Sequence, residues 1–213
     1  AGTNRPDTVV ILGFTHQMSF TGMALLDGDA LETAMGKSLI DTEGCELLAK
    51  HSKRIRMDAR PHETEHSAKN QIPFAQAALP DSRLIIGLIG DHDAATSDEL
   101  ASALKELAAK KPIVVVASTD LLHDPDYDLV TKTDKVTLER IRTLATEELI
   151  RLWSPRKQVC CGIMPVLTVM KFAASQGVSQ GTLMNYRNSG DDFQESRGTW
   201  VVGYGALAFS VKE

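Results

Sequence analysis

Apolar and polar residues follow one another in blocks along this chain, and the length of each block predicts its secondary structure. Three short, continuous apolar runs bounded by Gly, Pro or polar residues predict buried strands over 8–14, 83–90 and 112–118. Two later runs, 182–187 and 200–211, also have strand character and predict an antiparallel pair at a sheet edge.

Between these runs the apolar residues recur at helical spacing. A polar stretch over 57–66 that contains Pro61 predicts a loop, and Pro73 predicts a kink or a restart in the helix that follows. Strands separated by helices require crossover connections, so we expect an α/β fold in three layers, with a mainly parallel sheet and helices on both faces. Because no linker-like segment interrupts the pattern, we expect a single domain over 1–213. The predicted helices cover 38–50, 67–79, 97–110, 131–153 and 163–174.

Composition narrows the classes of function. The 213 residues are 43% hydrophobic and 24% charged, with a net charge of −5. An acidic chain lacks the basic footprint of general nucleic-acid binding, and no apolar run approaches the ~20 residues that span a bilayer. We therefore expect neither a nucleic-acid nor a membrane partner. The three cysteines, an odd number with two of them adjacent, argue against a disulfide framework and favour the cytoplasm.

Two histidines follow predicted strands. His16 comes just after the first run, and His123 follows the third run through Ser118-Thr119-Asp120. Open α/β sheets bind ligands beyond the carboxyl ends of their strands, so both positions are candidates for a site. Asp120 can orient His123 for acid/base chemistry, although a polar loop capped by an aspartate fits equally well. A hydrolase triad is excluded because Ser118 lacks a GxSxG turn.

Several side chains have metal-ligating chemistry but lie far apart in the sequence. His16, His66, His123 and Cys161 follow strands or precede helices, and imidazole and thiolate bind Fe, Zn and Cu. No HExxH or CxxC spacing links them, so the fold must bring them together. Surface histidines and a cysteine in a core turn are the alternatives. The run Asp91-His92-Asp93 is a competing ligand cluster, although its residues also favour turns.

Five sequence blocks resemble the Memo family, which includes the AmmeMemoRadiSam system protein B. The blocks occur in family order and span nearly the whole chain. Each block alone is weak, but their order makes the resemblance specific. The blocks are VVILGFTHQ (9–17), ETEHSAKNQIPF (63–74), VVVASTDLLHD (114–124), CGIMPV (161–166), and NYRNSGDD with VVGYGALAF within 185–209.

The resemblance implies a fold similar to class III extradiol dioxygenases, with a metal in a cleft at the strand ends. It assigns His16, His66 and Cys161 as metal ligands and His123 as the acid/base beside the metal. For an enzyme we expect Asp120 or Glu65 to orient these groups. The implied metal is Fe or Cu, with Zn as a further candidate. The related dioxygenases have a carboxylate as third ligand, so a cysteine there argues against ordinary ring cleavage.

Two positions depart from the family pattern. Gln17 stands where a second histidine is usual, and Ile163 replaces the usual arginine after Cys-Gly, which removes an anion contact.

Two functional hypotheses follow. The first is a metal-dependent redox or oxygenase-like enzyme with a small-molecule substrate. The second is a non-catalytic binding or scaffold protein that uses the same cleft to recognise a peptide or another partner. The family name suggests a third role, as an accessory to a radical-SAM system. A homo-oligomer is compatible with each.

Overall fold

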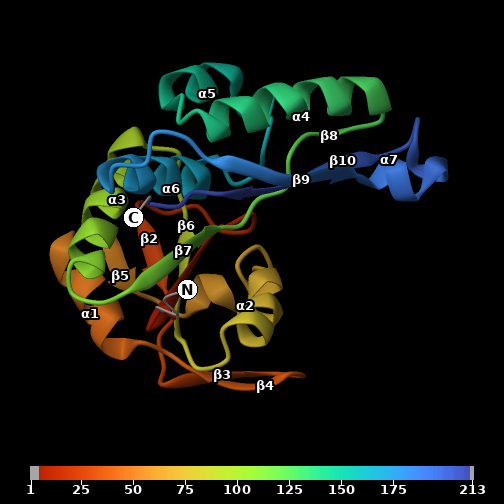
Figure 1. The fold of residues 1–213 in the computed structure, drawn as a ribbon. Coiled ribbons are helices and arrows are strands. Elements are labelled where there is room, and N and C mark those ends of the chain that lie inside the picture. The colour runs from red at the N-terminus through yellow and green to blue at the C-terminus, as the bar shows by residue number, and fades with distance from the viewer. Residues whose placement is uncertain (1–4, 212–213) are drawn as a thin grey trace. The chain divides into compact units, whose positions relative to one another are not determined.

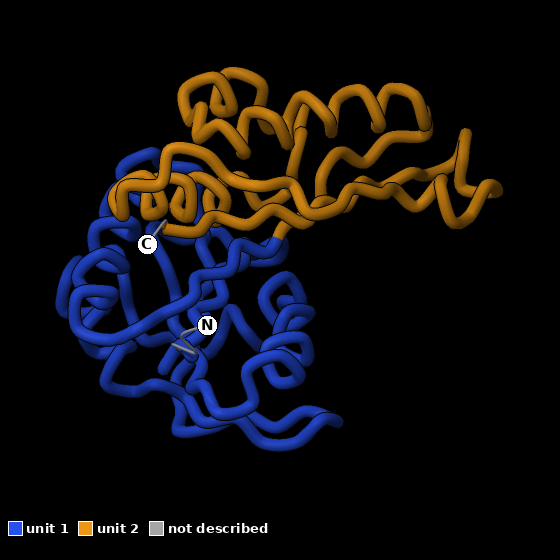
Figure 2. The backbone as a smooth tube through the Cα atoms, viewed as in Figure 1, with its two compact units in different colours: residues 1–118 blue, residues 119–213 orange. Residues whose placement is uncertain are grey.

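The computed structural model describes residues 5–211, which form two units (Figure 2). Unit 1 comprises residues up to Ser118 and unit 2 begins at Thr119. The expectation of a single domain over 1–213 stays a prediction.

Unit 1 is built on a five-stranded sheet with the order β5-β2-β6-β1-β7. Three of its four neighbouring pairs are parallel, and only β2 runs antiparallel to β6. This confirms the predicted α/β class with a mainly parallel sheet. The strands are β1 (Thr8–Phe14), β2 (Met23–Leu25), β5 (Ile55–Met57), β6 (Arg83–Ile89) and β7 (Ile113–Ala117).

The centre of this sheet is almost wholly apolar, as expected for parallel strands covered on both faces. Val10, Leu12 and Ile85 are completely buried. β1 lies between β6 and β7 and pairs with both in parallel, Val10 with Ile85 and with Val115. The carboxyl ends of these three strands therefore meet at one edge, where the segment after β1 begins.

Helices lie on both sides of this sheet, with α1 and α3 on one side and α2 on the other (Figure 1). Asp41 and Asp93 cap α1 and α3 by accepting backbone N–H bonds from Gly44 and Ala95. Pro73 lies in the first turn of α2, which confirms the predicted restart there. The helices are α1 (Thr42–His51), α2 (Ile72–Ala78) and α3 (Ala94–Ala108), with 3₁₀ turns at Arg60–His62 and Lys69–Gln71.

The helix predicted over 38–50 begins four residues later than expected. Ser38 and Leu39 instead belong to a hairpin of β3 (Ala30–Thr33) and β4 (Gly36–Leu39). Gly36 has a φ of 114°, which favours a glycine in the turn. The side chain of Gln76 also binds the hairpin, donating to the Gly36 carbonyl and accepting from Thr33 Oγ1.

Unit 2 contains a three-stranded sheet with the order β8-β10-β9. Its strands are β8 (His123–Asp124), β9 (Thr182–Asn188) and β10 (Val201–Ala208), and β9 and β10 form the antiparallel pair that the sequence predicts. Helix α4 packs on β9 and β10. None of the helices within residues 5–211 is long and apolar enough to cross a bilayer. The helices are α4 (Tyr127–Arg142), α5 (Thr146–Leu152), α6 (Ile163–Ser175) and the single turn α7 (Ser189–Asp192), with a 3₁₀ turn at Gln194–Ser196.

The single helix predicted over 131–153 is in fact two helices. α4 begins earlier, at Tyr127, because Asp126 caps it by accepting the N–H groups of Asp128 and Leu129. It ends at Arg142, and Leu144 then adopts a φ of 55°, which breaks the helix before α5. Leucine is a good helix former, so the sequence gives no signal of this break.

Among the glycines of unit 1, Gly22 lies closest to the backbone of another segment. We predict that Gly22→Ala strongly destabilises the chain. Its φ is 84°, and an added Cβ would lie 1.8 Å from the Arg54 carbonyl oxygen, which accepts the Met23 N–H. Gly177→Ala is the matched control, because Gly177 has nearly the same φ, 82°, but open space around it. We expect a loss of about 1 kcal/mol for the control and roughly 3 kcal/mol for Gly22→Ala in urea unfolding. An equal loss of stability in the two variants would contradict this prediction.

Candidate functional site

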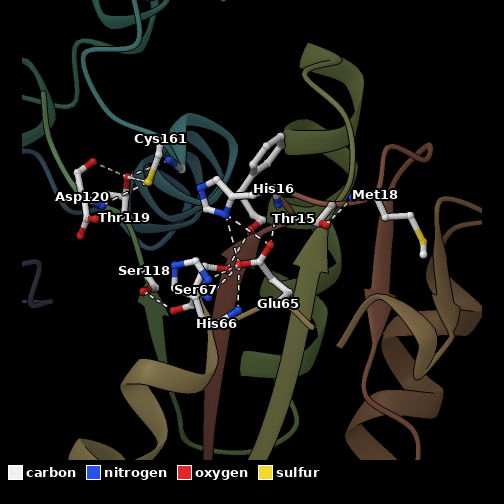
Figure 3. Close-up of polar contacts among 12 residues, drawn as sticks. Thr15, His16, Met18, Glu65, His66, Ser67, Ser118, Thr119, Asp120 and Cys161 are labelled. Atoms are coloured by element: carbon white, nitrogen blue, oxygen red, sulfur yellow. Dashed lines mark hydrogen bonds and ion pairs between the residues drawn. The ribbon is translucent and has the colours of Figure 1, made fainter. Parts of the chain in front are cut away.

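A buried carboxylate organises the segment that follows β1. Glu65 lies in the loop before α2, and its side chain has no solvent exposure. It accepts backbone N–H bonds from His16 (2.5 Å), His66 (2.9 Å) and Ser67 (2.9 Å). One side chain therefore joins the end of β1 to the loop at 65–67 (Figure 3).

The same carboxylate faces both imidazole rings. His16 Nδ1 lies 3.1 Å from Glu65 Oε1, and His66 Nδ1 lies 3.4 Å from the same oxygen. The two rings are stacked, with centroids 5.4 Å apart and planes 17° from parallel. An ionised carboxylate only accepts hydrogen bonds, so it selects the Nδ1–H tautomer of His16 and leaves Nε2 free to bind a ligand.

Glu65 remains charged in this buried position. Burial raises its pKa, but the hydrogen bonds from the backbone and ring of His16 and from the Ser67 and His66 N–H groups outweigh burial and lower the pKa to about 2. Within residues 5–211, His16, Glu65 and His66 form a group whose potential metal-binding atoms lie within 4.8 Å of one another. Because its oxygens already accept several N–H groups, Glu65 fits the role of orienting group better than that of third ligand.

Close packing holds this loop against the strand ends. Ser67 Oγ donates to the Phe14 carbonyl (2.8 Å), and Ser118 Oγ donates to the Ser67 carbonyl (2.7 Å). An added Cβ on Gly13 would lie 2.5 Å from Ser67 Oγ, so the loop fits only because β1 has a glycine there. The ends of β1 and β7 thereby fix the position of Glu65.

The competing cluster Asp91-His92-Asp93 has structural roles. Asp91 Oδ2 accepts the Gly22 N–H at 2.6 Å, and Asp93 caps α3 and pairs with Arg54 at 2.9 Å. The His92 ring lies 4.6 Å from the Phe14 ring. These aspartates are committed to turns and caps, in line with the alternative that the sequence left open.

In unit 2, Cys161 lies just before α6 and is hydrogen-bonded to the segment at 119–120. Its Sγ accepts the Asp120 N–H at 3.3 Å and lies 3.5 Å from Thr119 Oγ1, and its own N–H donates to the Asp120 carbonyl. Figure 3 shows these contacts. Gly162 N–H donates to Thr119 Oγ1 at 2.8 Å. Cys161 is a partly exposed free thiol, whereas Cys45 and Cys160 are buried.

Asp120 also faces His123. The His123 Nε2 lies 3.5 Å from Asp120 Oδ2, which is an ion-pair distance rather than a good hydrogen bond. The Nε2 atom is buried and has no hydrogen-bond partner among the described residues. Such an atom is available to exchange a proton with a bound group, so the geometry is compatible with the acid/base role expected of His123.

The structure thus gathers the predicted site residues into two groups. His16 and His66 lie together in unit 1, around Glu65, and Asp120, His123 and Cys161 lie together in unit 2. That the two groups form one metal site stays a prediction.

Sequence reasoning missed Asp134, a completely buried residue of α4. Its Oδ1 accepts the Leu122 N–H at 3.0 Å, next to His123, and its Oδ2 accepts the Tyr186 hydroxyl at 2.8 Å. The carboxyl group packs directly on Gly203, where an added Cβ would lie 1.8 Å from Oδ2. Burial raises its pKa to about 6, against the two hydrogen bonds and the charge of His123. Helical periodicity alone could not distinguish this aspartate from an exposed one.

Comparisons with known proteins identify the family of this chain. The family model for Memo-like proteins matches residues 2–208. The chain belongs to the Memo family. A MEMO1 family protein of Methanopyrus kandleri is 31% identical over 215 residues, which covers 98% of this chain and 74% of the relative. One of Pyrobaculum aerophilum is 30% identical over 213 residues, with the same two coverages.

A solved structure shares the fold of this chain at low sequence identity. The crystal structure of an uncharacterized protein from Escherichia coli K12 matches with a TM-score of 0.59. The match covers 94% of this chain and 87% of that protein, at 16% identity, so it bears on the fold alone.

We predict that Asp134→Asn removes a pH dependence of stability. The folded chain favours the protonated carboxyl, so its contribution to the free energy of unfolding is greatest below about pH 4 and is lost as pH rises to about 6. Asparagine keeps the shape and cannot ionise. In urea unfolding, the free energy of unfolding of the variant relative to wild type should therefore rise by roughly 2 kcal/mol between pH 4 and pH 7.

Asp128→Asn, an exposed aspartate of the same helix, is the control and should show no such gain. A stability difference between Asp134→Asn and wild type that stays constant from pH 4 to pH 7 would contradict the assignment.

Proposed function

We propose that this chain binds an Fe or Cu ion through His16, His66 and Cys161, and that the bound metal supports redox or oxygenase-like chemistry on a small molecule. The observation that carries the proposal is the buried Glu65 carboxylate against the Nδ1 atoms of His16 and His66. Metal-binding imidazoles are typically held in this way, because a carboxylate on Nδ1 fixes the ring and makes Nε2 a better donor.

The donor set fits these metals. Two imidazoles and a thiolate suit Cu, Fe and Zn and do not suit Mg²⁺ or Ca²⁺, which prefer oxygen ligands. The Asp120 N–H holds Cys161 Sγ in place, and hydrogen bonds to a ligating sulfur tune the potential of a bound metal. A metal held by three protein ligands would supply open coordination positions for substrate or oxygen.

His123 and Asp120 supply the proposed proton chemistry. The buried, unpartnered His123 Nε2 would hold or release a proton, and the Asp120 carboxylate at 3.5 Å would stabilise the charged imidazole. The three free cysteines agree with a reducing compartment, so we place this function in the cytoplasm.

Metal content tests the proposal. We expect the purified chain to carry about one Fe or Cu ion, measured by mass spectrometry of the metals, and His16→Ala and His66→Ala to lose most of it. His51→Ala is the control, because His51 pairs with Glu106 outside this group. Wild-type protein with no more metal than the double variant His16→Ala/His66→Ala would contradict metal binding and favour the alternative, a non-catalytic protein that recognises a peptide or another partner.

Alkylation of Cys161 tests whether the thiol shares the metal with the histidines. Cys45 and Cys160 are buried, so iodoacetamide should modify Cys161 first in the folded chain. Addition of Fe²⁺ or Cu⁺ should slow this reaction at least tenfold if the metal binds the sulfur. Peptide mapping by mass spectrometry identifies the modified residue.

The protection should disappear in His16→Ala and persist in the His51→Ala control. Protection that is unchanged in His16→Ala would show that the thiol binds metal without the histidines, which would contradict a shared site.

A further inference from the structure

One face of the β8–β10 pair carries His123 together with aromatic side chains. Val202 of β10 lies opposite His123 of β8. Residues two apart in a strand share a face, so Tyr204 lies on the same face as Val202 and His123. Trp200, just before β10, forms a T-shaped contact with His123, with ring centroids 5.8 Å apart and planes at 82°. The candidate acid/base residue therefore has an aromatic neighbour on this face at each side of Val202.

Both aromatic side chains are exposed to solvent. Trp200 is 56% exposed and Tyr204 is 48% exposed. Large apolar side chains grouped in this way on a surface are typical of binding sites, because their exposure costs free energy that a ligand can recover. Both residues come from a regular strand and its flank, so the sheet presents them in fixed positions.

A carboxylate gives this surface its charge. Asp120 faces His123, whose ring also contacts Trp200. Burial, together with the negative charge of Asp120, raises the pKa of Tyr204. Within residues 5–211, no lysine or arginine forms an ion pair with Asp120. The surface thus combines two aromatic rings with a carboxylate that no permanent cation neutralises.

We propose that Asp120, Trp200 and Tyr204 bind a ligand that carries an ammonium group next to an apolar or aromatic portion. The faces of tryptophan and tyrosine attract cations, and the carboxylate selects for positive charge. A ligand with a carboxylate or phosphate at the same place would be repelled by Asp120. This inference deepens the proposed function, since it gives the class of substrate presented to His123, but capture of the cation itself requires no metal.

Indole NMR signals test the proposal directly, because the chain has only two tryptophans, Trp153 and Trp200. Phenethylammonium is added to the full chain as purified at pH 8, and again after metal removal. We expect it to shift the Trp200 indole signal, assigned with Trp200→Phe, and to leave the Trp153 signal in place. Phenylacetate has the same ring with a negative charge, and we expect it to bind at least fivefold more weakly. The neutral 2-phenylethanol should lie between the two.

Two variants measure how much Asp120 and Tyr204 each contribute to binding. Asp120→Asn should weaken binding of phenethylammonium about three- to fivefold and reduce its preference over phenylacetate, leaving the part that the aromatic faces supply. Tyr204→Leu should weaken it roughly two- to fivefold. Phe193→Leu is the control, since Phe193 is an equally exposed aromatic residue of unit 2, and it should leave binding unchanged.

Equal binding of phenethylammonium and phenylacetate, or an unchanged preference in Asp120→Asn, would overturn the proposal. Metal content is measured on the same samples. A chain that takes up metal but shows no preference for the cation contradicts this inference alone. A chain that prefers the cation but takes up no metal contradicts the proposed function alone.

Discussion

The arrangement of the proposed metal-binding histidines depends on one buried ion, the carboxylate of Glu65. An ionised carboxylate without exposure is costly unless hydrogen bonds replace its water. Here three backbone N–H groups and the His16 ring supply those bonds. The backbone N–H groups reach the Glu65 carboxylate only if the loop at 65–67 packs against the end of β1. The packing that stabilises the buried charge therefore also positions the imidazoles.

Two of the buried carboxylates, those of Glu65 and Asp134, show how the number of hydrogen-bond donors decides whether a buried carboxylate stays charged. Glu65 accepts three backbone N–H groups, and its pKa falls to about 2 despite burial. Asp134 accepts one N–H group and one hydroxyl, and burial raises its pKa to about 6. Glu65 is thus a permanent charge suited to orienting imidazoles, whereas Asp134 is close to neutral at mildly acidic pH and serves mainly to join α4 to the segment before β8.

The sequence predicts best what depends on local composition. β1 matches its prediction at both ends, β6 differs by one residue at one end and β7 by one residue at each end, because continuous runs of apolar, mostly β-branched residues are typical of buried parallel strands. The hairpin of β3 and β4 and the break at Leu144 were missed, because their short strands and a left-handed leucine depend on tertiary contacts. Strand ends also pointed to His16 and His123. The pairing of β10 with β8 brings Trp200 and Tyr204 to the face of His123, and a hydrogen bond from the Leu122 N–H brings Asp134 next to it; no local pattern reveals either.

The covalent chain itself connects the two groups of candidate residues. Ser118, the last residue of unit 1, donates its hydroxyl to the Ser67 carbonyl beside Glu65. The next two residues, Thr119 and Asp120, contact the sulfur of Cys161. Consecutive residues of one segment thus stabilise the loop that orients the imidazoles and the position of the thiol. A change that shifts this segment would therefore disturb both the loop around Glu65 and the contacts of the thiol.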